Sequence, residues 1–236
     1  RQLYQKRYHK DLDDIQYRFN TIPLVTPDGI KRGSHGVPSG STFTNEVDSI
    51  VQYLIAKEYG ILDEDMCIQG DDGVYLVSDP KDLIYHFESY GLTVNMSKSK
   101  ISANTVQYLQ NLHSVENKTD GVCRGIYPTY RALGRILFPE RFTDFGEDDI
   151  KGSDFNSIRA ISILENCRNH PLFEDLVNFI IKLDKYNLAF SHQGLVKYIE
   201  RVQRSHGVEG IFRYRYEDDV TGILSFRTSK QIFKYL

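Results

Sequence analysis

The sequence lacks several features that define common protein classes. It contains no tryptophan, two methionines and three cysteines among its 236 residues. Cys67, Cys123 and Cys167 are isolated from one another, without a C-x-x-C spacing or a neighbouring histidine cluster. This pattern argues against structural zinc and favours a reducing compartment.

Long apolar runs and an excess of basic charge are lacking as well. No stretch approaches the ~18 consecutive apolar residues of a membrane span, and no signal peptide opens the chain. We therefore expect no membrane segment and no secretion. The net charge of −3 lacks the basic excess that nucleic-acid binding favours. It does not exclude such binding, because basic residues can be concentrated on one surface.

The first 120 residues predict an α+β fold with an antiparallel sheet. An opening helix precedes two short strands around Pro27-Asp28-Gly29, and a Gly/Ser/Pro loop leads into a helix from about Thr42 to Tyr59. Asp79 as N-cap, Pro80 at the first position and Gly91 past the end delimit another helix. Further strands are expected in MCIQ, VYLV, LTVN and TVQYLQNL.

The rest of the chain is dominated by helical patterns. They lie in PTYRALGRILF, FNSIRAISILENC, PLFEDLVNFIIKL and GLVKYIERVQ. The segment ENKTDG marks the change of character. We therefore expect two domains, an α+β domain over 1–120 and a mostly helical domain over 121–236.

The helix expected over 42–59 has an apolar stripe and a polar seam. The stripe predicts a face turned to the core, with Phe43, Val47, Ile50, Val51, Leu54 and Ile55. The seam beside it contains Ser41, Thr44, Asp48 and Gln52. It faces either water, with Ser41 or Thr42 as N-cap, or a ligand. Small hydroxyls in place of Lys and Glu favour the ligand.

The stretch MCIQGDDGVYLV places Asp71 and Asp72 at the tip of an expected hairpin. Strongly apolar flanks predict strands that are buried on both faces, which would set the two carboxylates at the mouth of a core. There they would repel each other unless a cation neutralised them, and oxygen ligands of this kind suit Mg²⁺ or Mn²⁺. An ordinary turn explains Gly-Asp-Asp equally well when the tripeptide is taken alone.

The order of motifs resembles that of the viral RNA-dependent RNA polymerases. The residues within the motifs are most similar to those of polymerases of the picobirnavirus and partitivirus kind. GVPSGSTFT followed by Asp48, then GDD, YGLTVNMSKS and VQYLQNL are similar to motifs B, C, D and E. The resemblance covers residues 22–112. It implies a partial right-hand polymerase palm followed by a helical thumb.

The resemblance also implies roles for single residues. Asp71 and Asp72 would be catalytic metal ligands for two Mg²⁺ or Mn²⁺ ions, and Lys98 would protonate pyrophosphate as general acid. Against this, Lys98 can be a surface lysine beside Lys100. The resemblance further implies that nucleotide is bound by Ser39, Gly40, Thr44 and Asp48.

RNA and ribonucleoside triphosphates are the partners that the resemblance implies. Tyr108 falls in the segment that would grip the primer. A basic cluster that would suit contact with the RNA backbone contains Arg124, Arg131, Arg135 and Arg141, although surface helices often carry such residues. The implied location is the host cytoplasm or the inside of the virus particle.

Two departures from the family pattern stand out. Many positive-strand viral polymerases have Asn where this chain has Asp48, so the way in which the ribose is recognised stays open. No Asp-x₄₋₅-Asp pair lies on a strand upstream, and Asp11, Asp13 and Asp14 sit in a polar, helix-like setting. The chain also starts at Arg1. We expect fingers and palm residues to be missing upstream, and the chain alone to be inactive.

Other interpretations remain open at this point. A second acidic segment, YRYEDD at 214–219, follows alternating Arg and Tyr with only 17 residues after it, and it reads as an acidic turn. A magnesium-dependent nucleotidyltransferase outside the viral family would need a third carboxylate near Asp71 and Asp72. A non-catalytic RNA-binding chain would tolerate Asp71→Asn.

Overall fold

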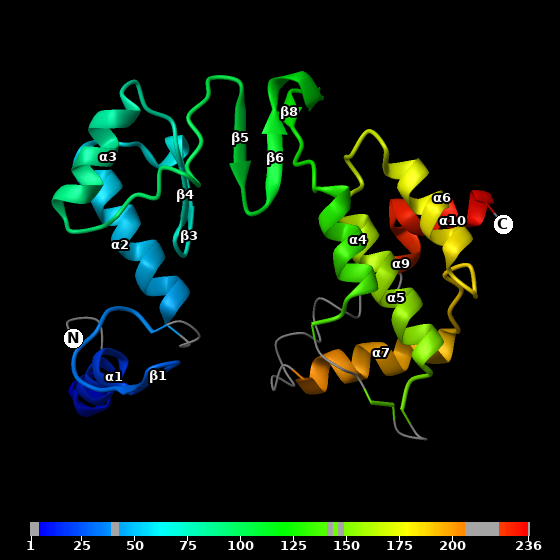
Figure 1. Ribbon diagram of the computed structural model, residues 1–236, viewed down its shortest axis with the longest axis horizontal. Helices are drawn as coiled ribbons and strands as arrows, with labels where there is room; N and C mark the ends of the chain where they lie inside the picture. Colours follow the sequence, from blue (N-terminus) through cyan, green and yellow to red (C-terminus); the bar gives the residue numbers. More distant parts are fainter. Residues whose placement is uncertain (1–4, 39–42, 141–143, 146–148, 206–221, 236) are drawn as a thin grey trace. The chain divides into compact units, whose positions relative to one another are not determined.

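The computed structural model describes residues 5–38, 43–140, 144–145, 149–205 and 222–235 (Figure 1). The chain divides into two compact units, Arg1–Leu109 and Gln110–Leu236. The sequence-based division after residue 120 differs from this, because residues 110–120 belong to the second unit. The labels palm and thumb stay predictions.

The first unit combines helices with short strands. Its elements are α1 (His9–Thr21), β1 (Leu24–Thr26), β2 (Gly29–Lys31), α2 (Thr44–Tyr59), β3 (Met66–Gln69), β4 (Asp72–Tyr75), α3 (Pro80–Ser89) and β5 (Thr105–Tyr108), with 3₁₀ turns at Lys6–Tyr8 and Asp63–Asp65. β1 pairs with β2 and β3 with β4, both antiparallel. In the described residues these pairs form separate hairpins, where the sequence predicted one sheet.

Helix α3 is bounded by the residues that the sequence predicts. The Asp79 Oδ1 atom accepts hydrogen bonds from the backbone N–H groups of Lys81 at 2.9 Å and Asp82 at 3.2 Å. Pro80 occupies the first turn, and Gly91 adopts a φ of +79° just past the end. The predicted cap, start and stop are confirmed.

The core of the first unit is small. Its buried residues are Ile55, Ala56, Ile61, Leu83 and Phe87. The prediction that the whole apolar stripe of α2 faces the core is wrong. Phe43, Ile50 and Leu54 are 45%, 56% and 59% exposed, because nothing in the described residues covers that side of the helix.

The predicted strand over 92–95 does not form. Asn95 instead organises a turn: its Oδ1 atom accepts from the Ser97 N–H at 3.1 Å, and its carbonyl oxygen accepts from the N–H groups of Lys98 and Ser99, both at 3.0 Å. Side-chain bonds of this kind compete with extended structure.

The second unit is mostly helical, as predicted. Its elements are β6 (Asn111–Ser114), β7 (Lys118–Thr119), β8 (Val122–Cys123), α4 (Thr129–Leu137), α5 (Gly152–Glu165), α6 (Phe173–Leu183), α7 (His192–Ser205), α9 (Gly222–Ser225) and α10 (Arg227–Tyr235), with a 3₁₀ turn at Val115–Asn117. The sequence did not predict α9 and α10.

Helix α5 forms the centre of this unit. It packs against α4, α7 and α10 (Figure 1), and residues on all its sides are buried, including Ile158, Ile161 and Leu164. At its first turn the buried Asp154 accepts hydrogen bonds from the Ser191 N–H at 3.2 Å and the Ser191 hydroxyl at 2.7 Å. In the described part of the chain, no helix is both long and apolar enough to cross a bilayer.

Candidate active site

The tip of the β3–β4 hairpin is a two-residue loop. Gln69 pairs with Asp72, so Gly70 and Asp71 connect the strands. Gly70 has a φ of +62°, whereas Asp71 is not among the residues with positive φ. Glycine at the first loop position fits a type II′ turn, whose twist matches that of the flanking strands. The sequence therefore encodes the turn through Gly70 and leaves both aspartates available.

Helix α2 holds this loop through its polar side chains. The Gly70 N–H donates to Ser49 Oγ at 2.7 Å, and Gln52 Nε2 donates to the Gly70 carbonyl oxygen at 2.6 Å. The Tyr75 hydroxyl donates to Gln52 Oε1 at 2.7 Å. Both backbone groups of Gly70 are thus bonded to one helix, and the hairpin tip is fixed.

Two glycines make this close approach possible. A Cβ atom at Gly70 would lie 3.1 Å from Asn45 Oδ1 and would strain a positive φ. At Gly73 it would lie 2.5 Å from the Tyr75 hydroxyl oxygen and 2.8 Å from Gln52 Oε1. A side chain at Gly70 would crowd Asn45, and one at Gly73 would displace the side chains of Tyr75 and Gln52, which bond to each other.

The carboxylates of Asp71 and Asp72 are exposed, and β3 is only half-buried. The prediction that both flanking strands are buried on both faces is therefore wrong. Carboxylate oxygens suit Mg²⁺ or Mn²⁺. Among the described residues, however, no group of three His, Cys, Asp or Glu side chains is placed to hold a metal ion. The pair fits as part of a ligand set rather than as a whole one.

The polar seam of α2 turns partly toward the hairpin. Gln52 contacts it directly, and the half-buried Asp48 lies one turn earlier on the helix. Thr44 Oγ1 donates to the Pro38 carbonyl oxygen at 2.6 Å, which anchors the chain just before residues 39–42. Ser39 and Gly40, both predicted to bind nucleotide, lie outside the described residues.

Sequence reasoning missed Ser49, Asn45 and Tyr75. Asn45, Ser49 and Gln52 follow one another at i, i+4 and i+7 on α2, so they share one helix face. This spacing is the signal in the sequence that could have grouped the three residues. It does not by itself reveal that their shared face contacts the β3–β4 hairpin.

Tyr108, on β5, lies near the same hairpin. Its strand contacts β4. Burial raises the pKa of the Tyr108 hydroxyl, and the neighbouring Cys67 and Asp72 raise it further. Burial also raises the pKa of Tyr75, with a smaller contribution from Tyr108. Lys98, the predicted general acid, is exposed in the turn after Asn95.

The basic residues predicted to contact RNA lie in the second unit. Arg131 and Arg135 are exposed four residues apart on α4. Arg124 is half-buried, and its Nη2 atom lies 3.9 Å from Asp120 Oδ2. Arg141 and the segment 214–219 lie outside the described residues.

Comparison with known proteins identifies the family. The family model for viral RNA-dependent RNA polymerases matches residues 6–118, which include the hairpin, α2 and β5. The chain belongs to the viral RNA-dependent RNA polymerases. The predicted resemblance is confirmed, and the segment 214–219 lies beyond the matched region.

Proteins of human picobirnavirus are similar to this chain. A potential RNA-dependent RNA polymerase of strain Human/Thailand/Hy005102/- is 35% identical over 183 residues, which are 74% of this chain and 34% of that protein. The crystal structure of a human picobirnavirus RNA-dependent RNA polymerase has a TM-score of 0.70 at 28% identity, covering 96% of this chain and 45% of that one.

A second crystal structure, of an insertion-loop deletion mutant of such a polymerase, has a TM-score of 0.72 at 27% identity. It covers 99% of this chain and 44% of that one. The chain therefore spans less than half the length of the relatives that it matches. Its mixture of helices and small antiparallel hairpins resembles their fold.

Proposed function

We propose that this chain contributes part of the active site of an RNA-directed RNA polymerase, which joins ribonucleotides on an RNA template during viral genome replication and transcription. Family membership supports the activity. The observation that carries the site assignment is the Gly70 clamp, because it fixes the backbone at the point where Asp71 and Asp72 project.

Asp71 and Asp72 would hold Mg²⁺ or Mn²⁺ together with further ligands. Bound there, such ions would supply activation of a primer hydroxyl and neutralisation of charge on the leaving pyrophosphate. The contribution of this chain is positional. Ser49 and Gln52 fix the turn, so the carboxylates need little reorganisation when the substrate arrives.

The remaining predicted residues would bind substrate around this tip. Thr44 and Asp48 on α2 would accept hydrogen bonds from the ribose hydroxyls, and the segment with Ser39 and Gly40 would contact the incoming nucleotide. Lys98 would protonate the pyrophosphate, and Tyr108 would contact the primer strand. Arg124, Arg131 and Arg135 would contact RNA phosphates.

The chain alone would be inactive. Asp11, Asp13 and Asp14 are exposed residues of helix α1. A helix does not provide the strand with an Asp-x₄₋₅-Asp pair that the family has. Fingers and palm residues outside this sequence would complete the site. This division of ligands also fits the lack of a three-ligand group among the described residues.

Of the two alternatives, a nucleotidyltransferase outside the viral family would need a third carboxylate near Asp71 and Asp72, and no group of three such ligands is found among the described residues. A non-catalytic RNA-binding role for this chain is tested by the experiment below. We place the protein in the host cytoplasm or within the virus particle.

The test is Mn²⁺- or Mg²⁺-dependent incorporation of labelled ribonucleotides on an RNA template. The protein is the longest polymerase reading frame that contains these residues. Asp71→Asn should abolish incorporation. Asp175→Asn, which makes the same change at an exposed position of α6, should not. Incorporation that survives Asp71→Asn would reduce the tip to an ordinary turn and favour the RNA-binding role.

A further inference from the structure

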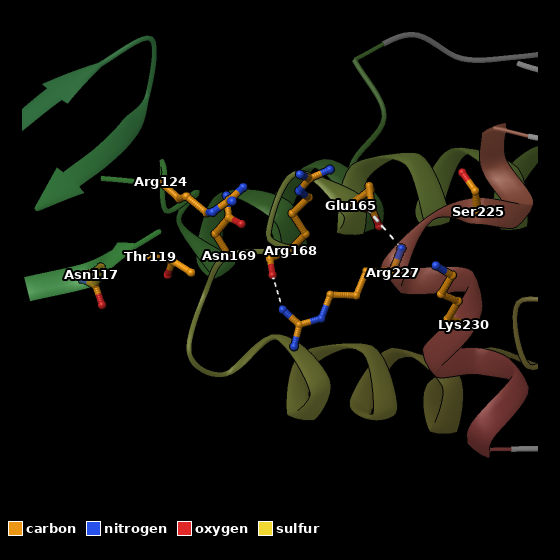
Figure 2. A pocket seen from close by; sticks show the side chains of 9 residues that line it. All are labelled: Asn117, Thr119, Arg124, Glu165, Arg168, Asn169, Ser225, Arg227 and Lys230. Carbon is orange, nitrogen blue, oxygen red and sulfur yellow. Dashed lines mark hydrogen bonds between the residues drawn. The ribbon is translucent and has the colours of Figure 1, made fainter. Parts of the chain in front are cut away.

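A basic cavity of about 570 Å³ lies entirely within the second unit. Figure 2 shows its lining side chains, which come from the β7–β8 region, from the end of α5 and from α9 and α10. Four of them are cationic: Arg124, Arg168, Arg227 and Lys230. Glu165 is the single acidic residue that lines it.

The carboxylate of Glu165 already accepts hydrogen bonds from helix α10. Glu165 Oε1 accepts from the Arg227 N–H at 3.2 Å (Figure 2). Its Oε2 atom accepts from the N–H and the hydroxyl of Thr228 at 3.0 and 2.8 Å. These bonds cap α10 at its N-terminus. Glu165 thus balances one charge of the cavity wall while its oxygens point to α10.

One of the arginines is also part of the wall. Arg227 Nη1 donates to the Arg168 carbonyl oxygen at 2.7 Å (Figure 2), and the Arg227 guanidinium lies 4.8 Å from the centre of the Phe173 ring. Its Nη2 atom lies 3.5 Å from Glu174. Arg227 therefore holds the ends of α5 and α6 together and is fixed in place.

The other cations lack such a role. The side chains of Arg168 and Lys230 are exposed, and neither makes an ion pair with a carboxylate among the described residues. Within the described part of the chain, the ion pair of Arg124 is the 3.9 Å contact with the largely exposed Asp120. Three positive side chains with weak or no partners thus face one cavity, where they repel one another unless an anion is bound.

The other groups that line the cavity, and a second cavity beside it, indicate which kind of anion would bind. The hydroxyl of Thr119, which also lines the cavity, adds a donor that suits a phosphate. A second cavity of about 450 Å³ shares Glu165, Arg168 and Asn169 with the first, and it contributes His113, Asn166 and Phe226. Amide, imidazole and aromatic groups next to a cationic cavity suit a nucleobase next to its phosphate.

We propose that the first cavity binds the phosphate groups of a nucleotide, either a free triphosphate or a residue of an RNA strand, with the base toward the second cavity. Arg168 and Lys230 bind the phosphate oxygens, and Arg227 keeps the wall in place. This site goes beyond the proposed function, because it requires neither catalysis nor Asp71 and Asp72.

The test measures binding to the whole chain in buffer without divalent cations. ATP is titrated by calorimetry, and a labelled single-stranded RNA ten-mer is followed by fluorescence anisotropy. The double variant Arg168→Ala/Lys230→Ala should weaken binding of the true ligand at least about tenfold, since each substitution removes a charge-assisted hydrogen bond. For RNA, the slope of log binding constant against log salt concentration should also become shallower by about 1.4, or about 0.7 for each lost phosphate contact.

Two controls keep the result specific. Lys182→Ala/Lys185→Ala removes the same charge from exposed positions outside the cavity and should leave binding unchanged. Arg168→Lys should retain the salt dependence. Loss of ATP binding would identify a free nucleotide as the ligand, and loss of RNA binding alone would identify a strand. If the double variant binds both probes like its charge-matched control, the proposal is wrong.

Discussion

The two units of the chain are stabilised in different ways. The second unit buries a continuous cluster around α5 that includes Phe173, Val177 and Ile181, all at most 1% exposed. Among its described residues, the first unit buries five hydrophobic side chains, and most of the apolar stripe on α2 is exposed. In the described residues, the second unit has its own core, whereas the first leaves a large apolar helix face uncovered.

The comparison shows how the first unit can still hold a defined site. Its hairpin is not fixed by burial between layers. Ser49 and Gln52 bind both backbone groups of Gly70, and Tyr75 completes the network. Directional polar contacts position the carboxylates where packing is sparse, and the predictions below test this contrast from the largest expected effect to the smallest.

Matched leucine truncations should separate the two units most strongly. Leu164 on α5 is 0% exposed, whereas Leu54 on α2 is 59% exposed. Leu164→Ala should lower the free energy of unfolding by about 3 kcal/mol, because it leaves a cavity in the core. Leu54→Ala should cost less than about 0.5 kcal/mol. Urea unfolding with hydrogen exchange in each unit would measure both. A comparable loss for Leu54→Ala would mean that this face of α2 is covered in solution.

The polar clamp should be the sensitive point of the first unit. Gln52→Ala removes the partners of the Gly70 carbonyl and the Tyr75 hydroxyl, at a cost of about 1–2 kcal/mol to the local structure. The Gly70 amide should then exchange with solvent about tenfold faster, as NMR can record. Gln16→Ala, at an exposed position of α1, is the control. Unchanged exchange at Gly70 would show that the clamp does not hold the turn.

The cysteines provide a chemical measure of the same contrast. Cys67 on β3 is exposed, whereas Cys167 is fully buried and burial raises its pKa to about 11. At pH 8 about one Cys167 thiol in a thousand would be ionised. Iodoacetamide should therefore modify Cys67 first and Cys167 only on unfolding, as mass spectrometry would show.

The same pKa shift has a consequence for stability. The ordinary thiol pKa is 9.0, so the unfolded chain loses this proton before the folded chain does. The contribution of Cys167 to stability is complete below about pH 9 and is lost as the pH rises toward 11. Cys167→Ala should remove this part of the pH dependence, and a pH profile that does not change would contradict the assignment.

The smallest effect concerns two glycines, one in each unit, that both have open space around them. Gly134 lies within α4, and Gly60 ends α2 at a φ of +104°. Gly134→Ala should stabilise the chain by about 0.5–1 kcal/mol, because alanine favours helix. Gly60→Ala should destabilise it by about 1 kcal/mol, because a positive φ strains a side chain. Thermal unfolding of both variants would test the sign. Two changes of the same sign would mean that φ does not decide the effect.

Local signals in the sequence predicted much of the fold. Asp79, Pro80 and Gly91 define α3 because capping depends on neighbouring residues, and periodicity located α4 to α7. The strand predicted over 92–95 failed because Asn95 binds its own turn, and α9 and α10 are too short or too polar for a clear periodic pattern.

For the site, the sequence indicated which residues belong together but not how they are held. Motif order predicted Asp71, Asp72 and Tyr108 as site residues, and in the structure Tyr108 lies close enough to Asp72 for that carboxylate to raise its pKa. The Ser49 and Gln52 contacts with Gly70 join residues about twenty positions apart, and no local pattern encodes such a pairing. Periodicity on α2 also could not reveal that its apolar side is uncovered in this chain.

The cap that Glu165 places on α10 sets an order for folding. Helix α10 has nine residues, too few to be stable in water by itself, and its cap comes from a residue 62 positions earlier in the chain. Helix α10 should therefore form late, after α5 has folded and presented Glu165. In a refolding time course, protection of the α10 amides should follow that of α5, and the basic cavity that both helices line would be completed only at that last step.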